Sequence, residues 1–198
     1  MLLFIGTAAV LAFAYLLGSL PTALLVSRHI KHLDIRHVGD GNVGARNTFH
    51  QIGHKYGVLV AIVDFFKGAL PVFLAYSMGL NLGWQMLTAI LAILGHDFPV
   101  FANFKGGQGT ATSLGTMLVL FHVPTLIGLA VYGIAFLIIK NSNVSLGIGG
   151  ATIAVILGIS RRWGMFAFAV PVFVFIPIKL WIDNPRRRAI EIIKNNRN

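Results

Sequence analysis

Long apolar runs separated by short polar segments make up most of this chain. A transmembrane helix needs about 20 consecutive apolar residues, and the first run, over residues 2–26, is long enough to cross a bilayer. Further runs cover residues 57–78 and 84–94, and two more pairs of runs lie on either side of Pro124 and of the Arg161-Arg162 dipeptide. The pattern predicts an all-α integral membrane protein with about seven transmembrane helices.

Some of these runs are short for a straight crossing. A helix rises only 1.5 Å per residue, so we expect the third, fourth and sixth spans to be tilted, broken or re-entrant. Irregular backbone at membrane depth is stable only where protein or a wet cavity covers it. This indicates a site near the glycine-rich segment 96–112. We expect residues 1–198 to form a single polytopic membrane domain.

Composition supports a membrane protein. The chain is 56% hydrophobic and 11% charged, whereas soluble domains average about 25% charged residues. The net charge of +10 would suggest nucleic acid in a soluble protein, but the basic residues lie between apolar runs, so they indicate topology and anionic-lipid contacts. The absence of cysteine excludes disulfides, thiolate metal sites and a cysteine nucleophile.

Loop charge predicts the orientation in the membrane. In a seven-span arrangement, the loops 28–56, 96–109 and 140–145 share one side with the C-terminal tail, and that side holds most of the Lys and Arg. This side is expected to be cytoplasmic, with the N-terminus outside a plasma or inner membrane. Only the Arg161-Arg162 loop departs from the rule. The start of the chain has neither a basic region nor a small-residue cleavage pattern, so we expect the first run to be retained as a span.

The strongest local motif reads FKGGQGT and follows the third span. Gly106, Gly107 and Gly109 allow backbone N–H groups to approach an anion closely. A helix that begins near Thr110 would add its N-terminal dipole, and Lys105 would add a positive charge for phosphate. The motif does not match GxxxxGK[ST], so it does not indicate a nucleotide triphosphatase. The alternative is an interhelical turn with a topogenic lysine.

A second polar motif, RHVGDGNVGARN, follows the first span. Arginine binds phosphate with two parallel hydrogen bonds, and asparagine side chains and glycine amides bind hydroxyl groups and phosphate oxygens. An ordinary polar loop rich in turn residues is the alternative interpretation. The candidate substrate-binding residues of this motif are Arg36, Asn42, Gly44, Arg46 and Asn47.

Four other polar features fall inside or beside predicted spans. Asp64 and Lys67 share one helix face at an i, i+3 spacing, and a structural ion pair is favoured over a catalytic role because charges at membrane depth require a partner. His96 is a structural hydrogen-bonding residue or a base. Ser145 stands at a helix start, where an N-cap needs no function. Asn184 precedes a basic RRR run that anionic lipids would attract.

Taken together, these segments resemble the bacterial membrane glycerol-3-phosphate acyltransferases that use acyl phosphate as the acyl donor. The resemblance covers nearly the whole chain and keeps the order of the motifs. The motifs that carry it are GSLP at 18–21, Arg36 with GDGNVGARN at 39–47, DFFKG at 64–68, GHDFPVFANFKGGQGTAT at 95–112, SLG at 145–147 and DN at 183–184.

The resemblance implies seven spans and an active site at the cytoplasmic membrane face. It implies transfer of a fatty acyl group from acyl phosphate to the sn-1 hydroxyl of glycerol 3-phosphate, giving lysophosphatidic acid and phosphate without cofactor or metal. The expected partners are these two substrates and membrane lipids, with no nucleic acid, and we expect a monomer. The resemblance implies that Lys105 and the loop with Gly106, Gly107 and Gly109 hold a phosphate, and that Ser145, Asn184 and the 36–47 loop help to bind glycerol 3-phosphate. The candidate catalytic residues are Lys105, Ser145, Asn184 and His96, and Thr110 is a further candidate for substrate binding.

The chain departs from the family pattern at several positions. Asp40 replaces a usual serine, Arg46 a threonine, His50 an arginine and Gln108 a second lysine. The histidine that usually precedes the C-terminal asparagine is absent from the stretch WIDN. These departures keep a divergent member with a lost or changed reaction as an alternative. A transporter of a phosphorylated small molecule is another: the charges in the second span favour it, but the polar loops favour one face, whereas alternating access needs a midplane site.

Overall fold

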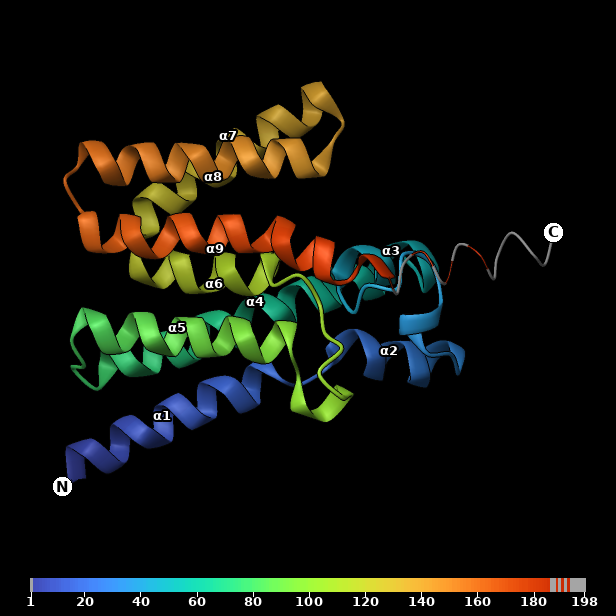
Figure 1. The fold of residues 1–198 in the computed structure, drawn as a ribbon, viewed down its shortest axis with the longest axis horizontal. Coiled ribbons are helices and arrows are strands. Elements are labelled where there is room, and N and C mark those ends of the chain that lie inside the picture. The colour runs from blue at the N-terminus through green and yellow to red at the C-terminus, as the bar shows by residue number, and fades with distance from the viewer. Residues whose placement is uncertain (1, 186–187, 189, 191, 193–198) are drawn as a thin grey trace.

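The structure is a computed structural model that describes residues 2–185, 188, 190 and 192. Every regular element among these residues is helical, as the expected fold class requires (Figure 1). The α-helices are α1 (Leu2–Gly18), α2 (Thr22–Lys31), α3 (Ala45–Gln51), α4 (His54–Ser77), α5 (Leu82–Asp97), α6 (Thr110–Leu120), α7 (His122–Ile139), α8 (Ser142–Ile159) and α9 (Trp163–Ile182), and the 3-10 helices are η1 (Ile35–His37) and η2 (Val100–Ala102).

Six helical segments within the described residues are long and apolar enough to cross a membrane. They are Phe4–Lys31, His54–Ser77, Leu82–Ala102, His122–Ile139, Ser142–Ile159 and Trp163–Ile182. The remaining predicted span is α6, whose 11 residues extend about 16 Å, roughly half of a bilayer core. The fourth predicted span, α6, is therefore short, as expected. The sixth predicted span, α8, has 18 residues and is longer than expected.

The first span, expected over residues 2–26, lies within the candidate membrane span Phe4–Lys31 and consists of two helices. Helix α1 ends at Gly18 and α2 begins at Thr22. Pro21 stands between them and lacks the N–H group that a continuous helix needs. Gly18 also allows a close helix crossing, because a Cβ atom there would overlap the carbonyl group of Ala92 in α5.

Two other predicted boundaries also shift. Helix α5 continues through His96 and Asp97, beyond the predicted 84–94, because both polar side chains are buried against neighbouring protein segments and not exposed to lipid. Pro124 does not separate two spans, since α7 already begins at His122. Proline is tolerated in the first turn of a helix, where its missing N–H would have no intrahelical acceptor.

The short helix α6 occupies the middle of the bundle. It packs most closely on α4 and also contacts α5, α7 and α9, as Figure 1 shows. Gly68 of α4 and Gly115 of α6 permit this crossing, because a Cβ on either glycine would overlap a backbone carbonyl of the other helix. Buried apolar residues of α4, α5, α8 and α9 pack against those of α6 in one cluster. The cluster includes Val72, Ile93, Met117, Leu157 and Phe168.

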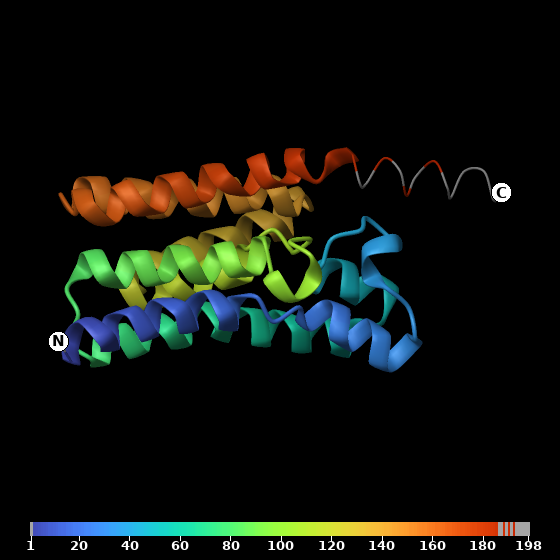
Figure 2. The ribbon, with the colours of Figure 1, turned by 60° about the horizontal axis from the view of Figure 1, so that its bottom comes forward.

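The polar segments gather at one end of the bundle. Helices α2 and α3, the 3-10 helix η2 and the loop that follows it lie at the end opposite the start of α1 in both views (Figures 1 and 2). A second apolar cluster holds this end together and includes Leu24, Ile35, Val43, Ile52 and Val60. The Arg161-Arg162 turn between α8 and α9 lies at the other end of the bundle.

Candidate functional site

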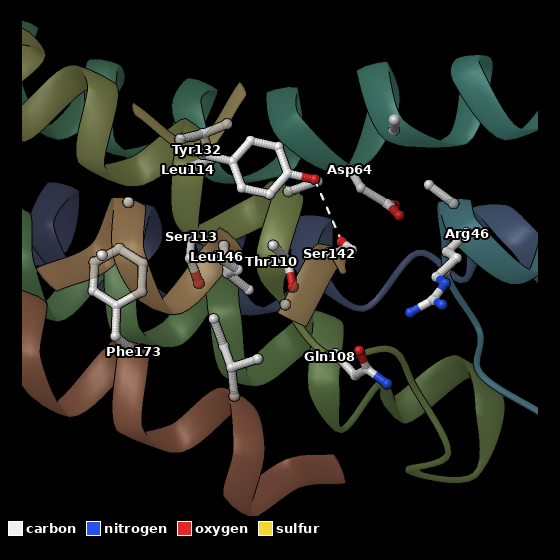
Figure 3. A pocket seen from close by; sticks show the side chains of 18 of the residues that line it. Arg46, Asp64, Gln108, Thr110, Ser113, Leu114, Tyr132, Ser142, Leu146 and Phe173 are labelled. Carbon is white, nitrogen blue, oxygen red and sulfur yellow. Dashed lines mark hydrogen bonds between the residues drawn. The ribbon is translucent and has the colours of Figure 1, made fainter. Parts of the chain in front are cut away.

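A cavity of about 370 Å³ opens at the polar end of the bundle and extends between α4, α6, α7, α8 and α9. Its wall is polar near the loops and apolar deeper in the bundle, and Figure 3 shows Arg46 and Gln108 on one side and Phe173 on the other. The polar lining includes Asn42, Arg46, Gln108, Thr110, Ser142 and Asn143, and the apolar lining includes Leu114, Met117, Leu129, Ile153, Phe173 and Ile176.

The glycine loop, residues 105–109, turns directly into the N-terminus of α6. Gly109 has a left-handed φ of 65° and no side chain caps the first turn of the helix. Gly109, Thr110 and Ala111 all line the cavity. The first N–H groups of a helix have no intrahelical acceptor and carry the positive end of its dipole. This end of α6 therefore offers the cavity a binding position for an anion.

His96 supports the glycine loop from behind. Its carbonyl oxygen accepts a hydrogen bond of 3.2 Å from the backbone N–H of Gly107. A Cβ on Gly107 would overlap the His96 imidazole, and a Cβ on Gly106 would overlap the His96 carbonyl oxygen. Both glycines are therefore required by close packing, and His96 reaches the cavity wall beside Gly109.

The 36–47 loop is organised by Asn47. Its side-chain amide donates to the carbonyl oxygens of Ile35, Val38 and Asn42, at 3.2, 3.0 and 3.1 Å. Asn47 does not line the cavity, and its side chain instead stabilises the conformation of the loop. Asn42, Gly44 and Arg46 do line the cavity, and among the described Lys and Arg residues Arg46 is the one on its wall.

Asp40 forms a tight turn in the same loop. Its carboxylate oxygen accepts a hydrogen bond of 3.1 Å from the backbone N–H of Asn42. A serine hydroxyl can accept the same bond in an analogous turn, which gives a physical reason why aspartate is compatible with a position where the family usually has serine. His50 is exposed on α3 and rests edge-on against the ring of Phe49 at 5.6 Å.

Asp64, Lys67 and His96 form a buried polar cluster at the base of the cavity. The Asp64 and Lys67 side chains are 2.8 Å apart, which is the ion pair that their spacing predicts. The Lys67 ammonium also donates to the carbonyl oxygen of Leu20, where the first span is broken. His96 Nδ1 lies 3.8 Å from the Asp64 carboxylate. Asp64 and His96 line the cavity, whereas Lys67 does not.

Arg36 and Lys105 lie outside the cavity. The Arg36 guanidinium contacts the Asp34 carboxylate at 2.6 Å and donates to the carbonyl oxygen of Ala102 at 3.2 Å. The Arg36 guanidinium holds the pKa of Asp34 well below its ordinary value, and the Asp34 carboxylate raises the pKa of Arg36. Arg36 therefore connects η1 to η2. The Lys105 side chain is exposed on the glycine loop.

Ser145 and Asn184 also lie off the cavity wall. The helix cap predicted at Ser145 is wrong: Asn141 caps α8 and accepts from two backbone N–H groups of its first turn. Ser145 lies one turn further and is buried, and its hydroxyl donates to the Asn141 carbonyl oxygen at 2.8 Å. Asn184 follows α9 and is half-buried. The predicted basic patch after Asn184 lies largely outside the described residues, since they exclude residues 186 and 187.

Several polar residues near the cavity escaped the sequence analysis. The Lys179 side chain is 1% exposed, lies 2.6 Å from Asp183 and stands over the ring of Phe98 at 5.1 Å. The sequence signal that could have identified Lys179 is a cation within the otherwise apolar run of α9. The Asp97 carboxylate is buried behind Gly109 without a hydrogen-bond partner among the described residues. Tyr132 and Ser142, 3.4 Å apart, line the cavity from α7 and α8.

The wall of the cavity leaves two polar groups unpaired. The Asn42 side-chain oxygen and the Ser113 hydroxyl are buried and have no hydrogen-bond partner among the described residues, although such groups are usually bonded. An anion-binding helix terminus, an arginine and unpaired polar atoms thus adjoin an apolar channel. This arrangement suits a phosphate group attached to a long apolar chain. No group of three or more histidine or acidic side chains suited to a metal occurs among the described residues.

Comparison with known protein families gives a match over most of the chain. The family profile described as Glycerol-3-phosphate acyltransferase matches residues 8–188. The glycerol-3-phosphate acyltransferase of Endomicrobium trichonymphae is 39% identical over 165 residues, which cover 81% of this chain and 82% of the relative. Glycerol-3-phosphate acyltransferase 1 of Dehalococcoides mccartyi (strain ATCC BAA-2266) is 36% identical over 197 residues, which cover 95% of this chain and 93% of the relative.

The same similarity appears among solved structures. The crystal structure of PlsY, an integral membrane glycerol 3-phosphate acyltransferase, in its glycerol 3-phosphate form aligns with a TM-score of 0.83 at 31% identity and covers 91% of each chain. The lysophosphatidic acid form aligns with a TM-score of 0.79 at 29% identity and covers 98% of this chain and 94% of that one. The arrangement of helices around the cavity is therefore shared with an integral membrane protein.

Proposed function

The chain belongs to the glycerol-3-phosphate acyltransferase family, and from this premise we propose that it transfers a fatty acyl group from acyl phosphate to the sn-1 hydroxyl of glycerol 3-phosphate. The products are lysophosphatidic acid and phosphate. The observation that carries this proposal is the cavity itself, whose anion-binding end adjoins an apolar channel inside the bundle. A phosphorylated acyl donor has the same division into a charged head and an apolar chain.

The reaction needs little covalent assistance from the protein. Acyl phosphate is an activated mixed anhydride, so holding it against the acceptor hydroxyl supplies much of the required rate. The N-terminus of α6 and Arg46 provide positive potential for the two phosphate groups. A phosphate oxygen of the donor takes the proton of the attacking hydroxyl. No Ser-His-Asp arrangement or carboxylate pair stands out in the sequence, and this motivates the substrate-assisted step. His96, which lines the cavity, is the alternative proton acceptor.

The other candidate residues are assigned supporting roles. Lys105 is exposed on the glycine loop, whose last two residues line the cavity, and its long side chain is proposed to close over the bound phosphate. Ser145 and Asn184 are proposed to act from the ends of α8 and α9 on glycerol 3-phosphate. The enzyme is proposed to work as a monomer in the plasma or inner membrane, with the cavity open to the cytoplasm and the N-terminus outside.

The proposal is tested by supplying purified protein with palmitoyl phosphate and labelled glycerol 3-phosphate. We expect phosphate release to match formation of labelled lysophosphatidic acid. Arg46→Ala should lower kcat/KM by about 10- to 100-fold, the usual effect of losing a hydrogen bond to a charged group. Arg162→Ala is the matched control, because Arg162 is exposed at the opposite end of the bundle.

Two results would contradict the proposal. Binding of palmitoyl phosphate without any lipid product would indicate a family member that has lost or changed the reaction, and other acyl acceptors would then be tried. Uptake of labelled glycerol 3-phosphate into proteoliposomes without new lipid would indicate a transporter.

A further inference from the structure

The hydroxyl group of Ser113 is buried at the cavity wall and has no hydrogen-bond partner among the described residues. Ser113 lies in the first turn of α6, is 2% exposed and lines the cavity. Its backbone is fully bonded: its N–H donates to the carbonyl oxygen of Gly109 at 2.7 Å, and its own carbonyl oxygen accepts from Thr116 at 2.8 Å. Its hydroxyl alone has no partner among the described residues.

Buried serine and threonine hydroxyl groups in four other helices do have hydrogen-bond partners. Ser27, Thr48, Thr88 and Thr125 each donate to a carbonyl oxygen three or four residues earlier in the same helix or at its N-cap. This local bond is the usual way for a helical serine or threonine to satisfy its hydroxyl. Ser113 makes no such bond, and it is a lining residue of the cavity, so its hydroxyl lies unpaired next to the space that a ligand would fill.

The position of Ser113 along α6 indicates which part of a ligand it meets. Thr110, Ser113, Leu114 and Met117 all line the cavity, at the spacing that places residues on one helix face. The face is polar in its first turn and apolar afterwards. Figure 3 shows Ser113 between Thr110 and the apolar side marked by Phe173. Ser113 thus stands at the boundary between the anion-binding end and the apolar channel.

An acyl phosphate has one polar group at this boundary, its carbonyl. The carbonyl carbon is joined to the phosphorus through a single bridging oxygen, so the carbonyl oxygen lies within a few ångströms of the phosphate. Ser113 lies about 4.5 Å along the helix axis beyond Thr110. A donor with its phosphate at the start of α6 and its chain along Leu114 and Met117 would place its carbonyl beside Ser113.

We propose that Ser113 is a catalytic residue whose hydroxyl donates a hydrogen bond to the carbonyl oxygen of the acyl donor. This inference rests on the proposed function. The hydroxyl oxygen of glycerol 3-phosphate forms a bond to the carbonyl carbon, and the π electron pair moves onto the carbonyl oxygen, where Ser113 stabilises the negative charge. The pair then returns as the carbon–oxygen bond to phosphate breaks. Phosphate leaves with the bonding electrons and carries the proton of the attacking hydroxyl.

The kinetic test compares Ser113→Ala with Ser27→Ala, a matched control that removes another buried serine hydroxyl, one that does not line the cavity. Ser113→Ala should lower kcat by about a hundredfold, as loss of one oxyanion donor does, with little change in the KM for glycerol 3-phosphate. Ser113→Thr, which keeps a hydroxyl, should recover most of the rate. Equal kcat values for the wild type and Ser113→Ala would overturn the proposal.

A spectroscopic test separates this contact from a merely structural effect. A non-hydrolysable acyl phosphonate with a 13C-labelled carbonyl is bound to each variant, and its carbonyl stretch is measured by infrared spectroscopy. The stretch should lie at lower frequency in the wild type and Ser27→Ala than in Ser113→Ala, because a hydrogen bond weakens the carbonyl bond. Identical frequencies would refute the contact even if Ser113→Ala lost activity.

The two proposals fail in different ways. If the wild type makes no lysophosphatidic acid but the bound analogue shows the Ser113-dependent shift, the acyltransferase reaction is excluded and the carbonyl contact stands. If the wild type is active and the shift is absent, the acyltransferase stands and the role of Ser113 is excluded. An analogue that does not bind to an inactive wild type would overturn both.

Discussion

At the scale of single residues, the buried charges connect the elements that surround the cavity. The Lys67 ammonium contacts Asp64 on its own helix and the Leu20 carbonyl oxygen at the break in the first span. Lys179 likewise pairs with Asp183 at the end of α9. Charges at membrane depth persist where they are paired and covered by protein. Each of these lysines neutralises a carboxylate, and each also contacts a distant segment: Lys67 through the Leu20 carbonyl oxygen and Lys179 through the ring of Phe98.

Removing one member of the Asp64–Lys67 pair should lower the free energy of unfolding much more than removing both members. Lys67→Met leaves a buried carboxylate without its cation, and we expect it to lower the free energy of unfolding by about 3 to 5 kcal/mol. The Asp64→Asn/Lys67→Met double variant should recover most of this loss. Unfolding by denaturant titration in detergent measures both effects, with Lys55→Met, which removes an exposed lysine of α4, as the control. A single variant no less stable than the double would contradict the prediction.

At the scale of elements, the placement of α6 depends on two glycines in its crossing with α4. A Cβ on Gly115 would overlap the carbonyl oxygen of Phe65, and a Cβ on Gly68 would overlap that of Thr112. Thr112 also donates to the Asp64 carbonyl oxygen at 2.9 Å. Because α6 is short and central, this close contact sets the depth of its N-terminus and thus of the glycine loop.

Gly115→Ala should therefore displace α6 from α4. We expect a loss of about 1 to 3 kcal/mol of stability, typical of overpacking, together with weaker donor binding. The matched control is Gly133→Ala in α7, where an added Cβ has no atom within 4 Å. Alanine is the better helix former, so the control should be neutral or slightly stabilising in the same unfolding assay. Equal effects of the two substitutions would show that the crossing tolerates a methyl group.

At the scale of the whole molecule, the two ends of the bundle are chemically different. The glycine loop, α2, α3 and the mouth of the cavity share one end, and the Arg161-Arg162 turn lies at the other (Figure 1). The cavity also faces a single end. This asymmetry fits an enzyme that receives charged substrates from one compartment and keeps an apolar chain within the bundle.

The orientation is directly testable, because the natural chain contains no cysteine. Lys140→Cys and Arg162→Cys introduce single thiols at exposed positions on opposite ends. With the cavity facing the cytoplasm, a membrane-impermeant maleimide should label Arg162→Cys in intact cells and Lys140→Cys only in inverted vesicles. The reverse pattern would place the cavity outside the cytoplasm.

Helix prediction was accurate where the apolar pattern was strong and less exact where contacts between distant segments bear on a helix boundary. The apolar run at 57–78 became α4, and the helix expected near Thr110 begins there. The span expected over residues 2–26 is divided into α1 and α2 at the GSLP motif. Pro21 lacks the N–H group that a continuous helix needs, and the Leu20 carbonyl oxygen at the break accepts a hydrogen bond from Lys67 of a distant segment.

The candidate site shows the same division. Asn42, Arg46, Gly109 and Thr110 line one cavity, and their role in substrate binding stays a prediction. Arg36 belongs to the same motif as Arg46, but its guanidinium binds Asp34 and the carbonyl oxygen of Ala102. Residue type and spacing show that a segment is suited to anions. Residue type and spacing do not show which of these side chains line the cavity and which stabilise the loops by hydrogen bonds and ion pairs within the protein.

The sequence by itself determined that this protein is a helical membrane protein, because apolar run length and charge placement follow from transfer free energies that need no tertiary contact. Its motifs also determined the family. Only the tertiary structure decided that α6 crosses half the bundle and that its polar first turn faces an apolar channel. The reason is that a cavity is formed by segments far apart in the chain, and the packing of Gly68 and Gly115 brings them together.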